Sequence, residues 1–227
     1  MNKKPLKDYI KKSVRKIKYR KGFGVHSPFA FSLITEVIEE KTPYYAYSVL
    51  QKLYNQKTVI PYKLSTLLLR LSNRFHARNI LEIGSDGGQS ALPIILTDSR
   101  NKIYSLADEL SKQKAKEHLS VLPEDRQNQI TMVKDILEVP EDFVADMVLL
   151  SYVPDGYDKN QLFEYLNTHT HENTIFFING IRPKQKMEEI WDLFCDDDNI
   201  QITMDMFDYG LAIRRPRFFK QHYIVSF

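Results

Sequence analysis

Acidic and glycine residues gather at one point of the chain, where an apolar run gives way to a helical pattern. The stretch is RNILEIGSDGGQSALPIIL at residues 78–96, in which the run ends at Glu82 and a Ser-Asp-Gly-Gly turn follows. Glycines let the backbone approach a ligand closely, and the next helix offers free N–H groups and the positive end of a dipole. Such a turn is the usual ligand cradle of an open α/β sheet. The sequence therefore predicts a small-molecule site here, the alternative being a purely structural turn.

The spacing of the glycines narrows the choice of ligand. Gly84, Gly87 and Gly88 do not follow the G-x-G-x-x-G pattern, which disfavours a dinucleotide fingerprint. The segment EIGSDGGQS at residues 82–90 resembles the first motif of the class I S-adenosylmethionine-dependent methyltransferases, in the catechol O-methyltransferase-like branch: an acid, then x-Gly-x-x-x-Gly-x-Ser. The resemblance covers roughly residues 60–215, and GFGVHSPFAF and RPRFFKQHY are similar to segments of little-studied bacterial members. Another doubly wound nucleotide binder is the alternative.

The resemblance implies S-adenosylmethionine as the cofactor and gives roles to the residues of the motif. Gly84 and Gly88 would shape the loop beside the methionine moiety, and Glu82 and Ser90 would help hold its amino and carboxylate ends. Two residues between the glycines are also candidates for cofactor binding, namely Ser85 and Asp86.

Three further polar residues follow predicted strands and are assigned to the cofactor through the same resemblance. The family's second strand usually ends in an acid that accepts hydrogen bonds from both ribose hydroxyls. Here KIYSLADEL has Ala107 at that place, so we assign Asp108 with a small shift in register, a helix cap being its alternative role. Asp135 in VKDILE would lie near the adenine edge, unless it is an ordinary loop acid. Ser151, after the fourth strand, completes the set.

Methyl transfer from a sulfonium requires mainly that the nucleophile, methyl carbon and sulfur lie in line. Catechol-type enzymes also activate a hydroxyl with a divalent ion, which acids after the fourth and fifth strands hold. This chain has Ser151 in SYVPDGY and Asn179-Gly180 in FFINGIRP where those acids are expected. One neutral ligand candidate holds a divalent ion poorly, so the sequence predicts no metal of the catechol type.

A hydroxyl acceptor still needs a group that takes its proton. Among the candidate bases we favour His26 in the GVHSPF turn, because the N-terminal segment of related folds lies over the cofactor cleft and imidazole accepts protons near neutral pH. Asp155 and Tyr157 follow the fourth strand and are expected to line the acceptor pocket. A packed or surface histidine is the alternative for His26. The other candidates considered are His169, His171 and His222.

The elements that would position these residues form an α/β pattern. Short apolar runs predict strands at residues 80–83, 103–106, 130–133, 144–150 and 175–178, with helical segments between them. NIQITMDMFDYGLAIRRP predicts a hairpin about a Tyr-Gly turn. The expected fold is a Rossmann-like, doubly wound sheet, mostly parallel, with an antiparallel C-terminal hairpin. Residues 1–75 are predicted as a helical N-terminal extension, with helices near 26–41, 42–57 and 61–75, and residues 76–227 as the S-adenosylmethionine-binding domain.

The charge of the chain is uneven. Residues 1–22 contain ten Lys or Arg and one acid, and the remaining residues contain 22 basic and 28 acidic side chains. Leu6, Ile10, Val14 and Ile17 recur at helical spacing, which predicts a short amphipathic helix. This basic arm could meet nucleic acid or an anionic membrane surface, or could be an ordinary solvated helix face, which we favour.

Composition and cysteine content indicate the class of protein. With 43% hydrophobic and 27% charged residues, the chain matches a soluble globular protein, and no apolar run approaches the ~18 residues of a membrane span. The single cysteine, Cys195, excludes an internal disulfide and fits a reduced, cytoplasmic protein. The oligomeric state stays open, a homodimer among the alternatives.

These observations predict a metal-independent methyltransferase that uses S-adenosylmethionine and acts on a small or medium acceptor, with oxygen as the methylated atom by family analogy. Two alternatives stay open. The substitutions at Ala107, Ser151 and Asn179 suit a catalytically decayed protein that binds the cofactor or regulates. The basic arm at residues 1–22 suits an RNA methyltransferase.

Overall fold

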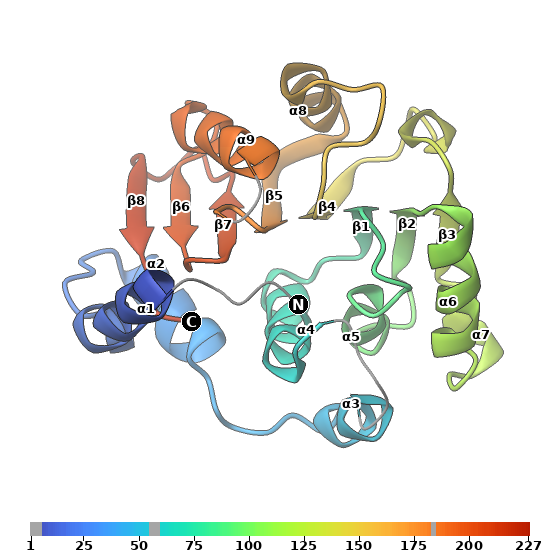
Figure 1. The fold of residues 1–227 in the computed structure, drawn as a ribbon, viewed down its shortest axis with the longest axis horizontal. Helices are drawn as coiled ribbons and strands as arrows, with labels where there is room; N and C mark the ends of the chain where they lie inside the picture. The colour runs from blue at the N-terminus through green and yellow to red at the C-terminus, as the bar shows by residue number, and fades with distance from the viewer. Residues whose placement is uncertain (1–5, 55–59, 183–184) are drawn as a thin grey trace.

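Each apolar run predicted as a strand forms one, and all of them join a single sheet (Figure 1). The computed structural model describes residues 6–54, 60–182 and 185–227. Within these ranges the strands are β1 (Asn79–Ile83), β2 (Lys102–Leu106), β3 (Ile130–Val133), β4 (Ala145–Leu150), β5 (Thr170–Asn179), β6 (Ile202–Asp205), β7 (Tyr209–Ile213) and β8 (Gln221–Ile224).

The strand order is β3-β2-β1-β4-β5-β7-β6-β8. Strands β1 to β5 pair in parallel, β7 runs antiparallel between β5 and β6, and β8 adds a parallel edge strand beside β6. The predicted doubly wound sheet with an antiparallel C-terminal hairpin is therefore confirmed. The carboxyl ends of β1 to β6 and of β8 consequently share one edge of the sheet, which we call the ligand edge because ligands of such folds bind there.

The hairpin turn lies earlier than predicted. Met206–Asp208 forms it, and the predicted turn residues Tyr209 and Gly210 begin β7. A Cβ atom on Gly210 would lie 2.4 Å from the ring of Trp191, so this glycine allows helix α9 to pack closely on the sheet. The glycine that suggested a turn thus serves packing.

Helices precede the sheet and connect its strands. The described helices are α1 (Leu6–Lys18), α2 (Pro28–Leu33), α3 (Tyr47–Tyr54), α4 (Tyr62–Phe75), α5 (Ala91–Ile95), α6 (Glu109–Leu119), α7 (Glu124–Gln127), α8 (Lys159–Thr168) and α9 (Gln185–Asp196), with shorter turns η1 (Arg20–Gly22), η2 (Ile34–Ile38) and η3 (Ile136–Glu138). Ser27 caps α2 by accepting a hydrogen bond from the backbone N–H of Ala30 at 3.3 Å, with Pro28 at the first helical position.

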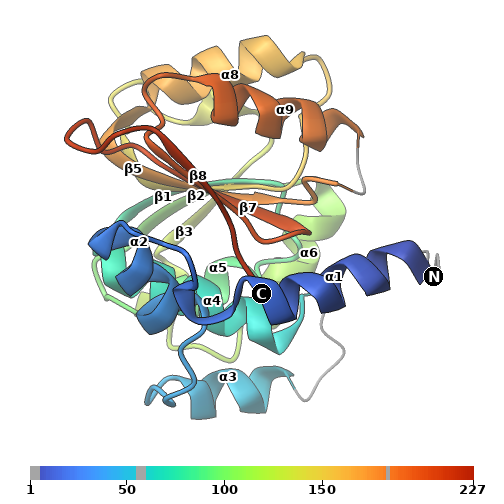
Figure 2. The same cartoon turned by 90° about the vertical axis from the view of Figure 1, so that its left-hand side faces the viewer.

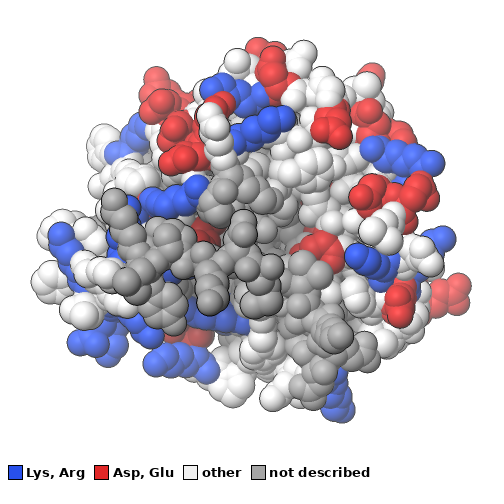
Figure 3. Space-filling view, in the orientation of Figure 1, with Lys and Arg blue, Asp and Glu red and all other residues white. Residues whose placement is uncertain are grey.

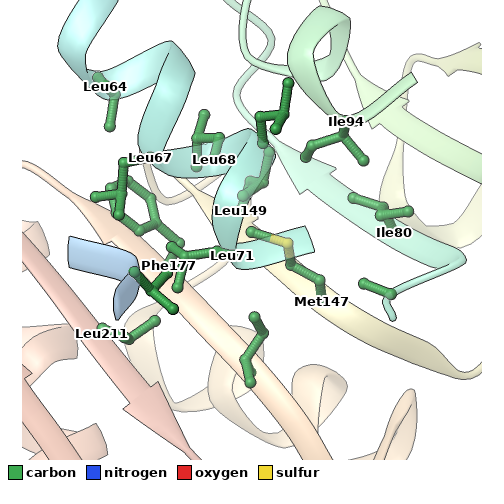
Figure 4. Packing of buried hydrophobic residues seen from close by; sticks show 14 of the residues in the cluster. Leu64, Leu67, Leu68, Leu71, Ile80, Ile94, Met147, Leu149, Phe177 and Leu211 are labelled. Carbon is green, nitrogen blue, oxygen red and sulfur yellow. The ribbon is translucent and has the colours of Figure 1, made fainter. Parts of the chain in front are cut away.

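Side chains alternate along each strand, so the sheet has a hydrophobic core on each face. Helices α8 and α9 cover one face, and α2, α4, α5 and α6 cover the other (Figure 2). Leucines of α4, among them Leu64, Leu67 and Leu71, point into the second core toward Met147 and Phe177 (Figure 4). The helical extension therefore shares a core with the sheet; the predicted division at residue 75 stays a prediction.

Helix α1 lies on the outside of the molecule, at the β8 edge of the sheet (Figures 1 and 2). It is the short amphipathic helix that the sequence predicted. None of the helices in the described ranges combines the length and the hydropathy of a membrane span.

Candidate functional site

The glycine-rich turn joins β1 to α5 at the ligand edge, and its backbone is held from several sides. Gly84, Gly87 and Gly88 have φ angles of 106°, 75° and 78°, in the left-handed region that favours glycine. The hydroxyl of Ser85 accepts a hydrogen bond from the N–H of Gly88 at 3.2 Å. The amide of Gly88 is thus bonded within the turn itself.

Helix α6 and the start of α4 fix the outer side of this turn. The Nδ1 atom of His118 lies 2.7 Å from the carbonyl oxygen of Gly87, and because a carbonyl only accepts, Nδ1 carries the proton. The side-chain oxygen of Gln89 accepts a hydrogen bond from the N–H of Ile60 at 3.2 Å. No sequence pattern pointed to His118, since its helix begins more than twenty residues after the turn.

Glu82, near the end of β1, and Asp86, in the turn itself, form a carboxyl pair at the hydroxyl of Ser90. Glu82 is fully buried near the end of β1, beside Ser105 of β2, and both Ser105 and Ser90 donate hydroxyl hydrogen bonds to it. Asp86 accepts a hydrogen bond from the N–H of Ser90 at 2.9 Å, and its carboxylate lies 3.1 Å from the Ser90 hydroxyl. A hydroxyl has one hydrogen, so Ser90 satisfies both carboxyls only when one of them is itself protonated.

Burial makes this pair unusually basic. Burial, and then the negative charge of Asp86, raises the pKa of Glu82 to about 7, against hydrogen bonds from Ser105 and Ser90 that act to lower it. Burial also raises the pKa of Asp86. Near neutral pH the pair therefore retains a proton, and a cationic ligand group would take the place of that proton.

Asp108, Asp135 and Tyr157 gather beyond the neighbouring strands β2 and β3. Asp108 caps α6, its carboxylate accepting a hydrogen bond from the N–H of Ser111 at 2.7 Å. Asp135 caps η3 and accepts a hydrogen bond from the Tyr157 hydroxyl at 3.2 Å. Both acids are exposed caps, as the structural alternatives in the sequence analysis describe. Either carboxylate could also accept a hydrogen bond from a ligand. A role in binding the cofactor stays a prediction for both.

The first residues after β4 meet the glycine turn directly. The N–H of Ser151 donates to the carbonyl of Ile83 at 2.9 Å, which extends the pairing of β4 with β1. Next in the chain, Tyr152 lies on Gly84: a Cβ atom there would be 2.6 Å from its ring. Burial, and then the negative charges of Asp108 and Asp155, raises the pKa of Tyr152. Sequence reasoning missed Tyr152, although its place directly after Ser151 was a usable signal.

The predicted base His26 is not brought to this site. It is exposed before α2, whose Phe29 packs on Phe218 with ring centroids 5.0 Å apart. Phe218 belongs to the connection from β7 to β8, and β7 ends opposite the beginning of β5. His26 is therefore at the edge of the sheet opposite to the ligand edge. The other histidines considered as bases also lie toward the beginnings of strands: His169 and His171 near the start of β5, and His222 in β8.

The donor set for a catechol-type metal does not fit. Ser151 follows β4 and Asn179 ends β5, and neither supplies a carboxylate. Asp155 is exposed further along the loop after β4. Within residues 6–54, 60–182 and 185–227, no three His, Cys, Asp or Glu side chains come together as metal ligands.

Several solved structures share this arrangement of strands and helices. A candidate caffeoyl-CoA O-methyltransferase of Staphylococcus aureus is 16% identical, with a TM-score of 0.59 over 76% of this chain and 93% of its own. The chain has the fold of the O-methyltransferases. An O-methyltransferase of Bacillus cereus in complex with S-adenosylhomocysteine is 18% identical, with a TM-score of 0.54 over 78% and 95% of the two chains.

The same fold extends beyond bacteria. The methyltransferase PaMTH1 of Podospora anserina, bound to S-adenosylhomocysteine, is 13% identical, with a TM-score of 0.57 over 84% of this chain and 97% of its own. No protein-family model and no curated protein sequence matches the chain. At these identities the likeness establishes the O-methyltransferase fold, and the chemistry must be argued from this chain's own residues.

The buried carboxyl of Glu82 predicts a specific pH dependence of stability. Its pKa of about 7 lies above the ordinary 4.5, so the contribution of Glu82 to stability is fully present below about pH 4.5 and is lost as the pH rises through 7. Glu82→Gln removes the ionisation. We expect it to raise the free energy of unfolding above pH 7 by about 3 kcal/mol, and to change it little near pH 4.5.

Urea unfolding between pH 4.5 and 8.5 measures this difference. Glu117→Gln, which removes an exposed acid of α6, is the matched control and should follow the natural chain at every pH. A Glu82→Gln difference that is the same at pH 4.5 and pH 8 contradicts a buried carboxyl with a raised pKa.

Proposed function

We propose that this protein is a methyltransferase that binds S-adenosylmethionine at the turn between β1 and α5 and methylates an oxygen atom of a small acceptor. The observation that carries this function is the carboxyl pair Glu82–Asp86, whose described hydrogen-bond partners are hydroxyl and amide groups with no cation among them. S-adenosylmethionine brings an ammonium group at its amino-acid end. Two of the similar structures are complexes with S-adenosylhomocysteine, which supports this cofactor.

The residues of the turn suit the cofactor's amino-acid end, and those beyond β2 and β3 suit its nucleoside. Glu82 and Asp86 would hold the ammonium through charge-assisted hydrogen bonds, with Ser90 and Ser85 beside them. The carboxylate of Asp108 has a second oxygen that can accept from a ribose hydroxyl. Asp135, further along the same edge, would meet the adenine. Gly88 would keep the loop close to helix α6, since a Cβ atom there would lie 3.3 Å from Ala115.

The bound cofactor would supply an electrophilic methyl group, and the chain's own task is to align an acceptor and remove its proton. Ser151 and Asn179 offer no carboxylate for a divalent ion, so we propose a metal-independent reaction. Asp155, exposed after β4 on the same loop as Tyr152, is the base we favour. Tyr157, hydrogen-bonded to Asp135, would line the acceptor pocket. His26 lies at the opposite edge of the sheet, so we propose no role for it as the base.

A catalytically decayed binding protein is the second candidate, and Tyr152 is the observation that favours it. Its ring lies where the methionine moiety would approach Gly84. An RNA methyltransferase gains less support, because Lys12 and Arg15 of the basic arm pair with Asp208 and Asp205 of the protein itself. A homodimer and a cytoplasmic location stay predictions from the sequence.

Cofactor binding should be coupled to proton release. If the ammonium group binds the ionised pair, affinity for S-adenosylhomocysteine increases about tenfold between pH 6 and pH 8, because at pH 6 about nine tenths of a group with a pKa near 7 is protonated. Isothermal titration in two buffers of different ionisation enthalpy measures both the affinity and the protons released.

Glu82→Gln is expected to abolish both the pH dependence and the proton release, and Glu117→Gln to preserve them. Binding of equal strength at both pH values would exclude the carboxyl pair as the ammonium site. Absence of any heat at millimolar ligand would exclude the cofactor. Binding without methyl transfer to a broad acceptor panel would favour the decayed protein.

Tyr152 should act as a competitor of the cofactor. Binding requires the ring to leave Gly84. The apparent affinity is therefore the intrinsic affinity multiplied by the fraction of molecules in which the ring has left. Tyr152→Ala is expected to tighten S-adenosylhomocysteine binding several-fold. Tyr152→Phe, which keeps the ring without the hydroxyl, should bind like the natural chain. Weaker binding by Tyr152→Ala would show instead that the ring supports the cofactor.

A further inference from the structure

Helix α1 is attached to the rest of the protein by its charged face. Arg15 donates two hydrogen bonds to the carboxylate of Asp205, at 2.7 and 3.2 Å, and Arg182 binds the same carboxylate. Burial acts to raise the pKa of Asp205, but the hydrogen bonds from Arg182 and Arg15 outweigh it and lower the pKa to about 2. Lys12, one turn before Arg15, pairs with Asp208. These ion pairs at the carboxyl end of β6 fix which side of α1 faces inward.

The opposite side of α1 is apolar and faces solvent. Ile10, Val14 and Ile17 are spaced by four and three residues, so they form one stripe along the helix. Their exposed fractions are 57%, 55% and 78%. A surface helix of a globular protein normally turns its apolar stripe toward the core. In α1 this orientation is reversed, and the packing of the described chain gives no reason for it.

Two phenylalanines extend the stripe beyond the helix. Ile17, Phe23 and Phe31 line one shallow depression of about 570 Å³, and Phe23 is 80% exposed. Lys18 and Lys21 line the same depression, together with Arg20. We call the apolar surface formed by Ile10, Val14, Ile17, Phe23 and Phe31 the α1 patch. It is thus an apolar surface bordered by cations.

The cations decide which partner suits the α1 patch. Lys11, Lys18, Arg20 and Lys21 are exposed around it, and Lys and Arg side chains gather over the region of α1 and α2 (Figure 3). A second copy of the chain would bring these like charges together across the contact. Nucleic acid would satisfy the charges but would leave the isoleucines and phenylalanines without an apolar partner. An anionic lipid surface satisfies both, with acyl chains for the stripe and headgroups for the cations.

We propose that α1 lies in the headgroup layer of an anionic membrane, with the α1 patch inserted toward the acyl chains and Lys11, Lys18, Arg20 and Lys21 at the phosphates. The ion pairs of Lys12 and Arg15 keep the helix on the protein while its outer face binds lipid. Such a helix lies in the plane of the surface without spanning the bilayer. This binding is independent of the proposed methyl transfer.

Co-sedimentation of the full chain with vesicles tests this surface. With equal parts of phosphatidylglycerol and phosphatidylcholine, we expect binding at least tenfold tighter than with phosphatidylcholine alone, and weaker binding at 0.5 M salt because exposed charges are screened. The double variant Val14→Ser with Ile17→Ser should lose at least tenfold in affinity. Its residues are exposed, so its melting temperature should match that of the natural chain.

A matched control removes equally exposed apolar side chains elsewhere. Val121→Ser with Leu137→Ser, at 52% and 75% exposure, should bind vesicles like the natural chain. Equal vesicle binding by the two double variants overturns the proposal, as does absence of binding to anionic vesicles. The natural chain could instead form a dimer or an RNA complex, without binding vesicles. If the Val14/Ile17 variant loses that dimer or complex, the membrane proposal is overturned and the α1 patch is assigned to that partner.

Discussion

A buried carboxyl group, Glu82, and a half-buried one, Asp86, lie at the same serine hydroxyl, and this pair dominates the electrostatics of the ligand edge. Glu82 cannot leave the core, because it belongs to a central strand and Ser105 of the next strand holds it. Asp86 is held near it by the backbone and side chain of Ser90. Two neighbouring negative charges repel each other, and burial of Glu82 strengthens this effect, so the pair favours the uptake of a proton or an external cation. That preference supports our proposal that the turn is a binding site.

The same edge of the sheet positions every other part of the proposed site. Parallel strands bring Asp108, Asp135 and the loop of Ser151 and Tyr152 to one side of the molecule. The ring of Tyr152 packs on Gly84, so the loop after β4 meets the glycine turn directly.

The sheet was predictable because its strands are short apolar runs with regular spacing. A short apolar run between helical segments is the usual sequence pattern of a buried parallel strand. Strand β8 was not predicted, since Gln221–Ile224 is a four-residue edge strand that begins with two exposed polar residues and shows no apolar run. The hairpin turn was misplaced because Gly210 reads as a turn residue, whereas its role is to admit the ring of Trp191. Only tertiary packing reveals that role.

The candidate site was predictable where one short segment contains it, as in residues 82–90. It was not predictable where distant segments meet. His26 was chosen because N-terminal segments often cover the cleft, but the contact of Phe29 with Phe218 takes that turn to the opposite edge. His118 reaches the turn from α6, and no local sequence pattern indicates that contact. Tyr152 reaches it from the end of β4, where its place directly after Ser151 was the one usable signal.

A crystal structure with S-adenosylhomocysteine bound tests the central claim most directly. The account predicts the ligand's ammonium group within hydrogen-bond distance of Glu82 or Asp86, with the ring of Tyr152 moved away from Gly84. A ligand bound elsewhere, or Tyr152 still packed on Gly84 beside a bound ligand, would contradict it.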